Sequence, residues 1–181
     1  MTTPIRLFTK IFGALAAILL LSNSSFAQNY TSYDLIVPTS PHTGAATIID
    51  GTGRLMPSNR SFIIGVEGGL RSTLVFANWT AVNPNYPVII VNQHGTGRVV
   101  IKDDGVTYRD GMRLDNCSFV KLLGNNDPAH RYGFEVAQAG RMPAPGVPRI
   151  SRLGLSVGAT STNVEVAFIE VHHTGFAGIM A

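Results

Sequence analysis

Glu170 and His172 are two residues whose types and spacing could support chemistry. They stand two positions apart in an alternating apolar–polar stretch, so on a β-strand both side chains point outward on one face, about 6.5 Å apart. A carboxylate and an imidazole at that separation could share a metal ion or a sugar hydroxyl. Zinc needs three or four ligands, and no third is identifiable, because His173 points to the opposite face. We favour the alternative, a solvated outer face.

Arg113 and Glu135 form a second candidate pair, at equivalent outward positions 22 residues apart in a repeated pattern. If the two strands are neighbours, these side chains stack about 4.8 Å apart. The pair could clamp an acidic sugar through Arg113, or it could be a surface ion pair worth less than about 1 kcal/mol. We favour the ion pair. The candidate ligand-binding residues are therefore Arg113, Glu135, Glu170 and His172, and no catalytic residue is identifiable.

Oxygen donors for calcium are present, but their spacing does not bring them together. Glu165, Glu170 and Asp127 are the conceivable ligands, and a calcium site would need several such oxygens to converge from adjacent strands. We expect no cofactor and no metal site, with calcium as the alternative. Cys117 is the only cysteine, which rules out an intrachain disulfide. We expect its thiol to be chemically unreactive and partly buried.

One short pattern organises the second half of the chain. A glycine followed by an apolar, a variable and another apolar residue begins at Gly111, Gly133, Gly154 and Gly178, in steps of 22, 21 and 24 residues. A recurring step of about 20–25 residues with β-type alternation is typical of stacked solenoid coils. We therefore predict that these four copies are equivalent strands of successive coils.

Short runs of β-forming residues separated by glycine, asparagine and aspartate predict the other strands. The earlier ones are expected at 46–50, 61–66, 74–76, 88–91 and 99–101, with Gly68-Gly69 acting as a stop. The apolar alternation slips phase between Phe168 and Ile169, which predicts a corner between two strands that face one interior. No helical period follows Leu21, so we expect almost no helix in the mature protein.

These features resemble the right-handed parallel β-helix superfamily, the pectin-lyase-like fold. The resemblance is carried by the glycine-apolar starts, by asparagine at turns (Asn92, Asn116) and by the stretch 162–171. It implies an all-β, right-handed, single-stranded parallel β-helix, an extracellular setting and often a carbohydrate ligand. Lyases of this fold use a basic residue as base and carboxylate-held calcium, and no position here matches such a motif. The chain ends inside a strand pattern, so we expect the solenoid to be incomplete at its C-terminus.

The first residues have the features of an export signal. Arg6 and Lys10 precede an apolar run at 11–21, and Ser25 and Ala27 form a small-x-small cleavage pattern. The run has 11 residues, against roughly 20 for a membrane span. We predict a signal peptide at 1–27, a lead-in or cap at 28–45 and coils at 46–181, with no stable membrane span after cleavage.

The charge composition limits the classes of molecule that we expect this protein to bind. Losing Arg6 and Lys10 lowers the formal net charge from +3 to +1, and the remaining basic residues are interspersed with acids, so we expect no nucleic acid partner. We predict an exported protein that is extracellular, periplasmic or cell-surface and that binds or processes polysaccharide. The alternatives are a polysaccharide lyase or glycoside hydrolase acting on acidic glycans, and a structural or adhesive solenoid without catalysis.

Overall fold

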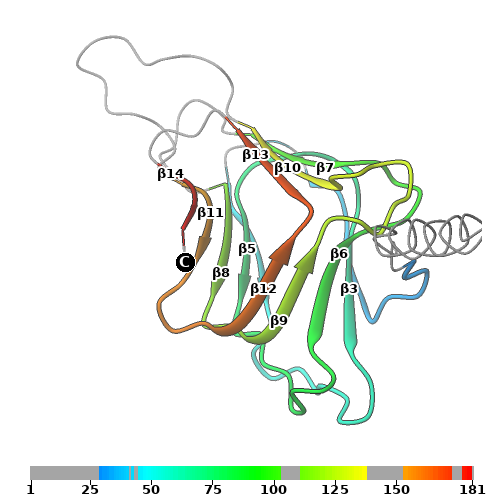
Figure 1. Ribbon diagram of the computed structural model, residues 1–181, viewed down its shortest axis with the longest axis vertical. Helices are drawn as coiled ribbons and strands as arrows, with labels where there is room; N and C mark the ends of the chain where they lie inside the picture. Colours follow the sequence, from blue (N-terminus) through cyan, green and yellow to red (C-terminus); the bar gives the residue numbers. More distant parts are fainter. Residues whose placement is uncertain are drawn as a thin grey trace, which may run out of the picture.

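The computed structural model describes residues 29–40, 42, 45–102, 111–137, 153–172 and 177–180, and this part of the chain consists of strands, turns and loops (Figure 1). The described residues contain no helix, and none of them could therefore form a helical membrane span. All pairings between the named strands are parallel.

The strands form three sheets, which we call A, B and C. Sheet A runs in the order β1 (Leu35–Val37), β3 (Phe62–Val66), β6 (Val88–Asn92), β9 (Ser118–Leu123), β12 (Thr162–Ala167). Sheet B runs in the order β2 (Thr47–Asp50), β5 (Leu74–Ala77), β8 (Met112–Asp115), β11 (Leu153–Val157), β14 (Ala177–Met180). Sheet C runs in the order β4 (Gly69–Arg71), β7 (Val99–Ile101), β10 (Phe134–Ala137), β13 (Ile169–His172).

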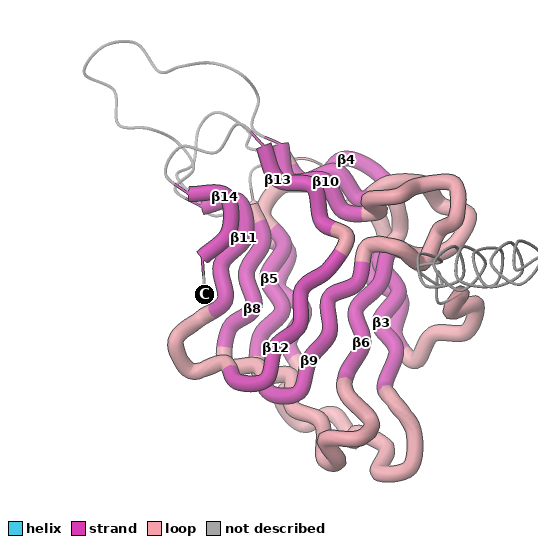
Figure 2. The backbone as a smooth tube through the Cα atoms, viewed as in Figure 1, coloured by secondary structure: helices cyan, strands magenta, loops and turns pink. Residues whose placement is uncertain are grey.

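From β3 onward the chain visits sheets A, C and B in turn and then returns to sheet A. Each circuit therefore adds one strand to every sheet, beside the strand of the circuit before (Figure 2). This is the arrangement of a β-solenoid, and it confirms the prediction of an all-β chain built from stacked parallel strands. The sequence missed β4, which begins at Gly69, where we expected only a stop.

The interior is filled by side chains that stack from circuit to circuit. In sheet A, Ile64, Ile90 and Leu122 lie side by side in register, and all three are fully buried. In sheet C, Val99 and Phe134 are register partners and are equally buried. Burying one such side chain contributes about 1.5–3 kcal/mol, so the repeated alternation of each strand becomes one continuous core.

The corner predicted at Phe168 is present. Phe168 separates β12 from β13 and has a φ of 59°, in the left-handed region that few non-glycine residues adopt. This residue breaks the two-residue alternation, so the last inward residue of β12 and the first of β13 both face the core. Gly124 stands at the equivalent corner one circuit earlier, and a Cβ there would clash with the Phe168 carbonyl oxygen.

Asparagine makes the corner between sheets B and A. Asn78 and Asn116 follow β5 and β8 with φ values of 59° and 51°. Their side chains form a ladder in which Asn116 Nδ2 donates to Asn78 Oδ1 at 2.8 Å and Asn78 Nδ2 donates to Asp50 Oδ1 at 3.1 Å. The turn predicted at Asn116 is confirmed, whereas Asn92 is the buried last residue of β6.

The four glycine-apolar copies are not equivalent, and this prediction was wrong. Met112, Leu155 and Ile179 are register partners in sheet B, so the copies at Gly111, Gly154 and Gly178 do stack. The copy that begins at Gly133 leads into β10, which belongs to sheet C. The first true step is therefore 43 residues and contains three strands, because the same glycine-apolar signature begins strands on two different sheets.

Arg71 lies at the N-terminal end of the core. It is aligned with the inward-facing Ile101 and is fully buried. Its guanidinium donates to the carbonyl oxygens of Pro38 at 2.9 Å and Glu67 at 2.6 Å. Burial lowers the pKa of Arg71 from its ordinary value, while the nearby Glu67 charge opposes that shift. Arg71 thus supplies hydrogen-bond donors to backbone carbonyl groups beside β4, the first strand of sheet C.

The lead-in contributes a strand and a strap. β1 pairs with β3, and the preceding residues cross the outer face of sheet A, where Tyr30 and Tyr33 pack on a second apolar cluster. The Tyr33 ring covers Gly65 so closely that a Cβ there would lie 2.6 Å from a ring carbon. We call residues 29–34 the N-terminal strap.

Asp34 anchors this strap, and replacing the Asp34 carboxylate should reveal a pH-dependent contribution to the stability of the protein. Hydrogen bonds from Arg60, at 2.8 and 2.6 Å, and from the Ile63 backbone N–H hold the pKa of Asp34 below its ordinary 3.8. A lowered folded-state pKa stabilises the protein above the unfolded pKa, and the contribution is lost as pH falls through the folded value.

We therefore expect Asp34→Asn to lower the urea midpoint at about pH 7, through a loss of unfolding free energy of less than about 1 kcal/mol because the pair is partly exposed. The difference should be smaller at about pH 2.5, because the stabilisation declines once the pH lies below the unfolded pKa. In an Arg60→Gln background, Asp34→Asn should cost less. A midpoint difference that is the same at both pH values would contradict this account.

The thiol of Cys117 should be inert in the folded protein. Cys117 is fully buried, its Sγ lies near the Phe76 and Asp115 carbonyl oxygens, and desolvation raises its pKa to about 11. We expect negligible labelling by a disulfide reagent at about pH 8 and complete labelling in urea, because the thiolate is the reactive form. Rapid labelling of the native protein would contradict this burial.

Candidate functional sites on sheets C and A

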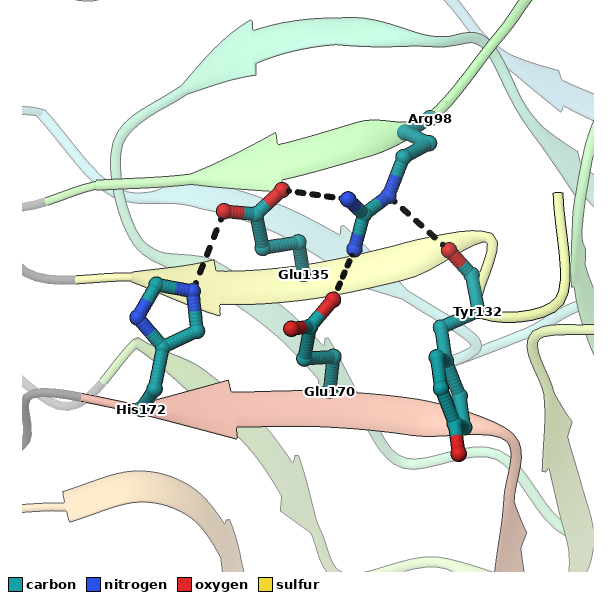
Figure 3. A network of polar contacts seen from close by, with 5 residues as sticks. All are labelled: Arg98, Tyr132, Glu135, Glu170 and His172. Atoms are coloured by element: carbon teal, nitrogen blue, oxygen red, sulfur yellow. Dashed lines mark hydrogen bonds and ion pairs between the residues drawn. The ribbon is translucent and has the colours of Figure 1, made fainter.

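Three of the four sequence-predicted residues meet on the outer face of sheet C (Figure 3). Glu135 on β10 and Glu170 on β13 are register partners, and His172 lies two residues farther along β13. Arg98, directly before β7, joins them from one circuit earlier. The prediction that Glu170 and His172 point to the same outer face is confirmed, since both reach this group.

Arg98 links the two carboxylates. Its Nη1 lies 3.0 Å from Glu135 Oε2, its Nη2 donates to Glu170 Oε2, and its Nε donates to the Tyr132 carbonyl oxygen at 3.0 Å. His172 Nε2 lies 3.1 Å from the second oxygen of Glu135. We call Arg98, Glu135, Glu170 and His172 the sheet C network. It cross-links three successive circuits on one face.

Arg113 does not belong to this group, and the predicted stacking of Arg113 on Glu135 was wrong. Arg113 lies on sheet B, where its register partners are Val75 and Ser156, and its guanidinium pairs with Asp115 at 2.8 Å. The sequence missed Arg98 because neighbours across a solenoid depend on the lengths of the connections. Its only local signal was a basic residue directly before the apolar run of β7.

The sheet C network is suited to holding strands together. Two carboxylates on neighbouring strands repel each other, and the guanidinium between them offsets that repulsion. Arg98 and His172 already bind three of the four carboxylate oxygens. A ligand would have to displace these internal partners, so we interpret the network as a structural cross-link.

The three calcium-donor candidates lie apart. Glu165 is on β12 in sheet A and pairs with Lys121, Glu170 belongs to the sheet C network, and Asp127 accepts the Ala129 N–H within the loop after β9. Within the described ranges, no three His, Cys, Asp or Glu side chains are grouped closely enough to hold a metal ion.

A second site, which the sequence did not predict, is an open groove of about 460 Å³ on the outer face of sheet A. We call it the sheet A groove. Its lining residues come from the strap, from the connections before β3 and β6, and from β6, β9 and β12: Tyr30, Ser61, Pro84, Asn85, Pro87, Ile89, Phe119, Lys121, Asn163, Val164 and Glu165.

The strand register brings three lining residues of this groove into one row. Ile89, Lys121 and Glu165 are consecutive partners across β6, β9 and β12, so one outward row changes from apolar to charged. Lys121 Nζ lies 2.6 Å from Glu165 Oε2, and both side chains are partly exposed. Phe119 and Asn163 have φ values of 53° and 52°, which locally interrupts the alternation of β9 and β12.

Tyr30 forms one wall of the sheet A groove because Asn126 holds the strap in place. Asn126 is fully buried in the loop after β9, and its side-chain amide binds both backbone groups of Tyr30, at 2.6 and 3.0 Å. The same amide also donates to the Tyr33 hydroxyl oxygen at 3.1 Å. Burial raises the pKa of Tyr30 above its ordinary value. The wall is therefore a neutral phenol with a fixed backbone.

Sequence gave no comparable signal for this groove. Trp79, the only tryptophan in the sequence, is fully buried and donates its Nε1–H to the Ile49 carbonyl oxygen at 2.8 Å, so it is not a surface for sugar stacking. The residues that do line the groove are far apart in the chain, from Tyr30 to Glu165.

Comparison with family models, with curated proteins and with solved structures finds no match for this chain.

Removing the Arg98 cation should destabilise the protein through its two carboxylates. In Arg98→Gln, Glu135 and Glu170 remain on neighbouring strands without the guanidinium that both contact. We expect a loss of about 1 kcal/mol of unfolding free energy in low salt. The loss should shrink in about 1 M NaCl, where the screening length falls to about 3 Å.

Arg113→Gln is the matched control, since its carboxylate partner Asp115 is two residues away on the same strand. We expect this control to have a smaller effect. Adding Glu170→Gln to Arg98→Gln should restore part of the loss by removing one of the repelling charges. An Arg98→Gln effect that is independent of salt, or no effect, would contradict the role assigned to this residue.

Proposed function

We propose that this chain is an exported β-helix protein that binds polysaccharide in the sheet A groove. We also propose that the solenoid is the right-handed, single-stranded parallel β-helix that the sequence resembles. The export signal pattern at 1–27 supports a location outside the cytoplasm. The groove is the observation that carries the binding function, because it is concave and its mainly polar lining also includes some apolar surface.

The lining chemistry suits a sugar chain. Tyr30 and Pro87, which are partly exposed, offer apolar surfaces for the C–H faces of sugar rings. Asn85 and Asn163 each carry amide donors and a carbonyl acceptor, which match hydroxyl groups that both donate and accept. A groove open to solvent can bind a stretch of polymer whose two ends continue beyond it.

Binding without cleavage fits this groove better than hydrolysis. Most glycoside hydrolases use two carboxyl groups placed on either side of the scissile bond. Among the described lining residues only Glu165 carries a carboxylate, and it is paired with Lys121. The adjacent carboxylates Glu135 and Glu170 lie on sheet C and are joined by Arg98.

The proposal predicts that Tyr30→Ala and Asn85→Ala each weaken polysaccharide binding about fivefold, which corresponds to about 1 kcal/mol for one lost contact. Tyr132→Ala is the matched control, because Tyr132 lies beside the sheet C network. Binding is measured by calorimetry with oligosaccharides and by retention on insoluble polysaccharide, with thermal melts verifying that each variant is folded.

The same mixtures are assayed for new reducing ends and for unsaturated uronate, and we expect neither product. A protein that binds no glycan, or variants at Tyr30 and Asn85 that bind like wild type, would overturn the proposal. Product formed by wild type would replace the binding function with that of a hydrolase or lyase.

A further inference from the structure

The charges of the sheet A groove are internally compensated. Lys121 and Glu165 are the cation and the anion among the described lining residues, and they form an ion pair at 2.6 Å across β9 and β12. Arg60, directly before the lining residue Ser61, is held through both of its terminal nitrogens by Asp34, at 2.8 and 2.6 Å. Among the described residues, Lys121 in this groove and Arg60 beside it therefore both already have a carboxylate partner.

From this pairing we infer that the groove selects neutral, hydroxyl-rich glycans over uronate-rich ones. The inference rests on the proposed function and names its substrate class. Binding of a uronate is favoured by a free cation that offsets the loss of water from the sugar carboxylate. At Lys121 a uronate would have to compete with Glu165, and the two carboxylates would repel each other.

A neutral sugar meets no such conflict. The ammonium of Lys121 has three donor hydrogens and the carboxylate of Glu165 about four acceptor positions, so the ion pair leaves capacity on both partners. Donor and acceptor then stand side by side, where adjacent hydroxyls of one sugar ring can bind both. Asn85 and Asn163 add neutral donors and acceptors without changing the charge.

Glu165→Gln tests the inference by removing one charge while keeping the side-chain shape. The side chain of Glu165 is 53% exposed, so the substitution should leave the fold intact. Calorimetric titrations use cellohexaose, xylohexaose and mannohexaose as neutral probes and hexagalacturonate and oligomannuronate as acidic probes. Wild type should bind at least one neutral probe at least tenfold more tightly than either acidic probe.

In Glu165→Gln the freed Lys121 should raise affinity for the acidic probes at least fivefold, and this gain should shrink as salt increases. Asp115→Asn is the matched control, because it removes a carboxylate from an ion pair on sheet B and should not change the preference. Lys121→Gln, which leaves Glu165 unpaired, should weaken binding of the acidic probes further.

Three outcomes decide between the claims. Tighter binding of acidic than of neutral probes by wild type would overturn the inference and leave the proposed binding function standing. A neutral preference that Glu165→Gln does not change would overturn the ion pair as its cause. Failure of every probe of both classes to bind would remove the proposed function and the inference together.

Discussion

The structure depends on one constraint: each circuit must turn its corners while all of its strands direct their apolar side chains at a single interior. A strand alternates with period two, so a corner must break that alternation at a defined residue. Phe168 does so in the left-handed region, and Gly124 stands at the same corner one circuit earlier. Asn78 and Asn116 form the corner between sheets B and A, and their stacked side-chain amides hydrogen-bond to each other.

The corners bring the outward residues of successive circuits side by side. The side chains that meet in this way differ from one outer face to another. On sheet C, Arg98 bridges two glutamates that are register partners, and His172 contacts one of them. These side chains bind one another and cross-link the strands. On sheet A, the outward row leaves Lys121 and Glu165 beside a groove. The same rule of stacking therefore produces a cross-link on one face and an accessible surface on another.

The N-terminal strap connects the stability of the solenoid to the shape of this groove. Its aromatic rings cover apolar residues on the outer face of sheet A, which would otherwise be exposed. Asp34 and Asn126 fix it at two points, one near β3 and one in the loop after β9. Tyr30 is bound by Asn126 and also lines the groove, so the segment that completes the outer apolar cluster forms a wall of the proposed binding site.

By itself the sequence determined the strand-rich solenoid, the corner at Phe168, the burial of Cys117 and the shared outer face of Glu170 and His172. Each of these follows from local alternation or composition, which a single strand carries within a few residues. Tertiary structure alone decided which side chains are neighbours. Equivalent residues such as Ile90 and Leu122, or Leu122 and Val166, are separated by connections of unequal length, so spacing in sequence cannot supply the register. For that reason Glu135 meets Arg98 and not Arg113, and a groove forms from residues as distant as Tyr30 and Glu165.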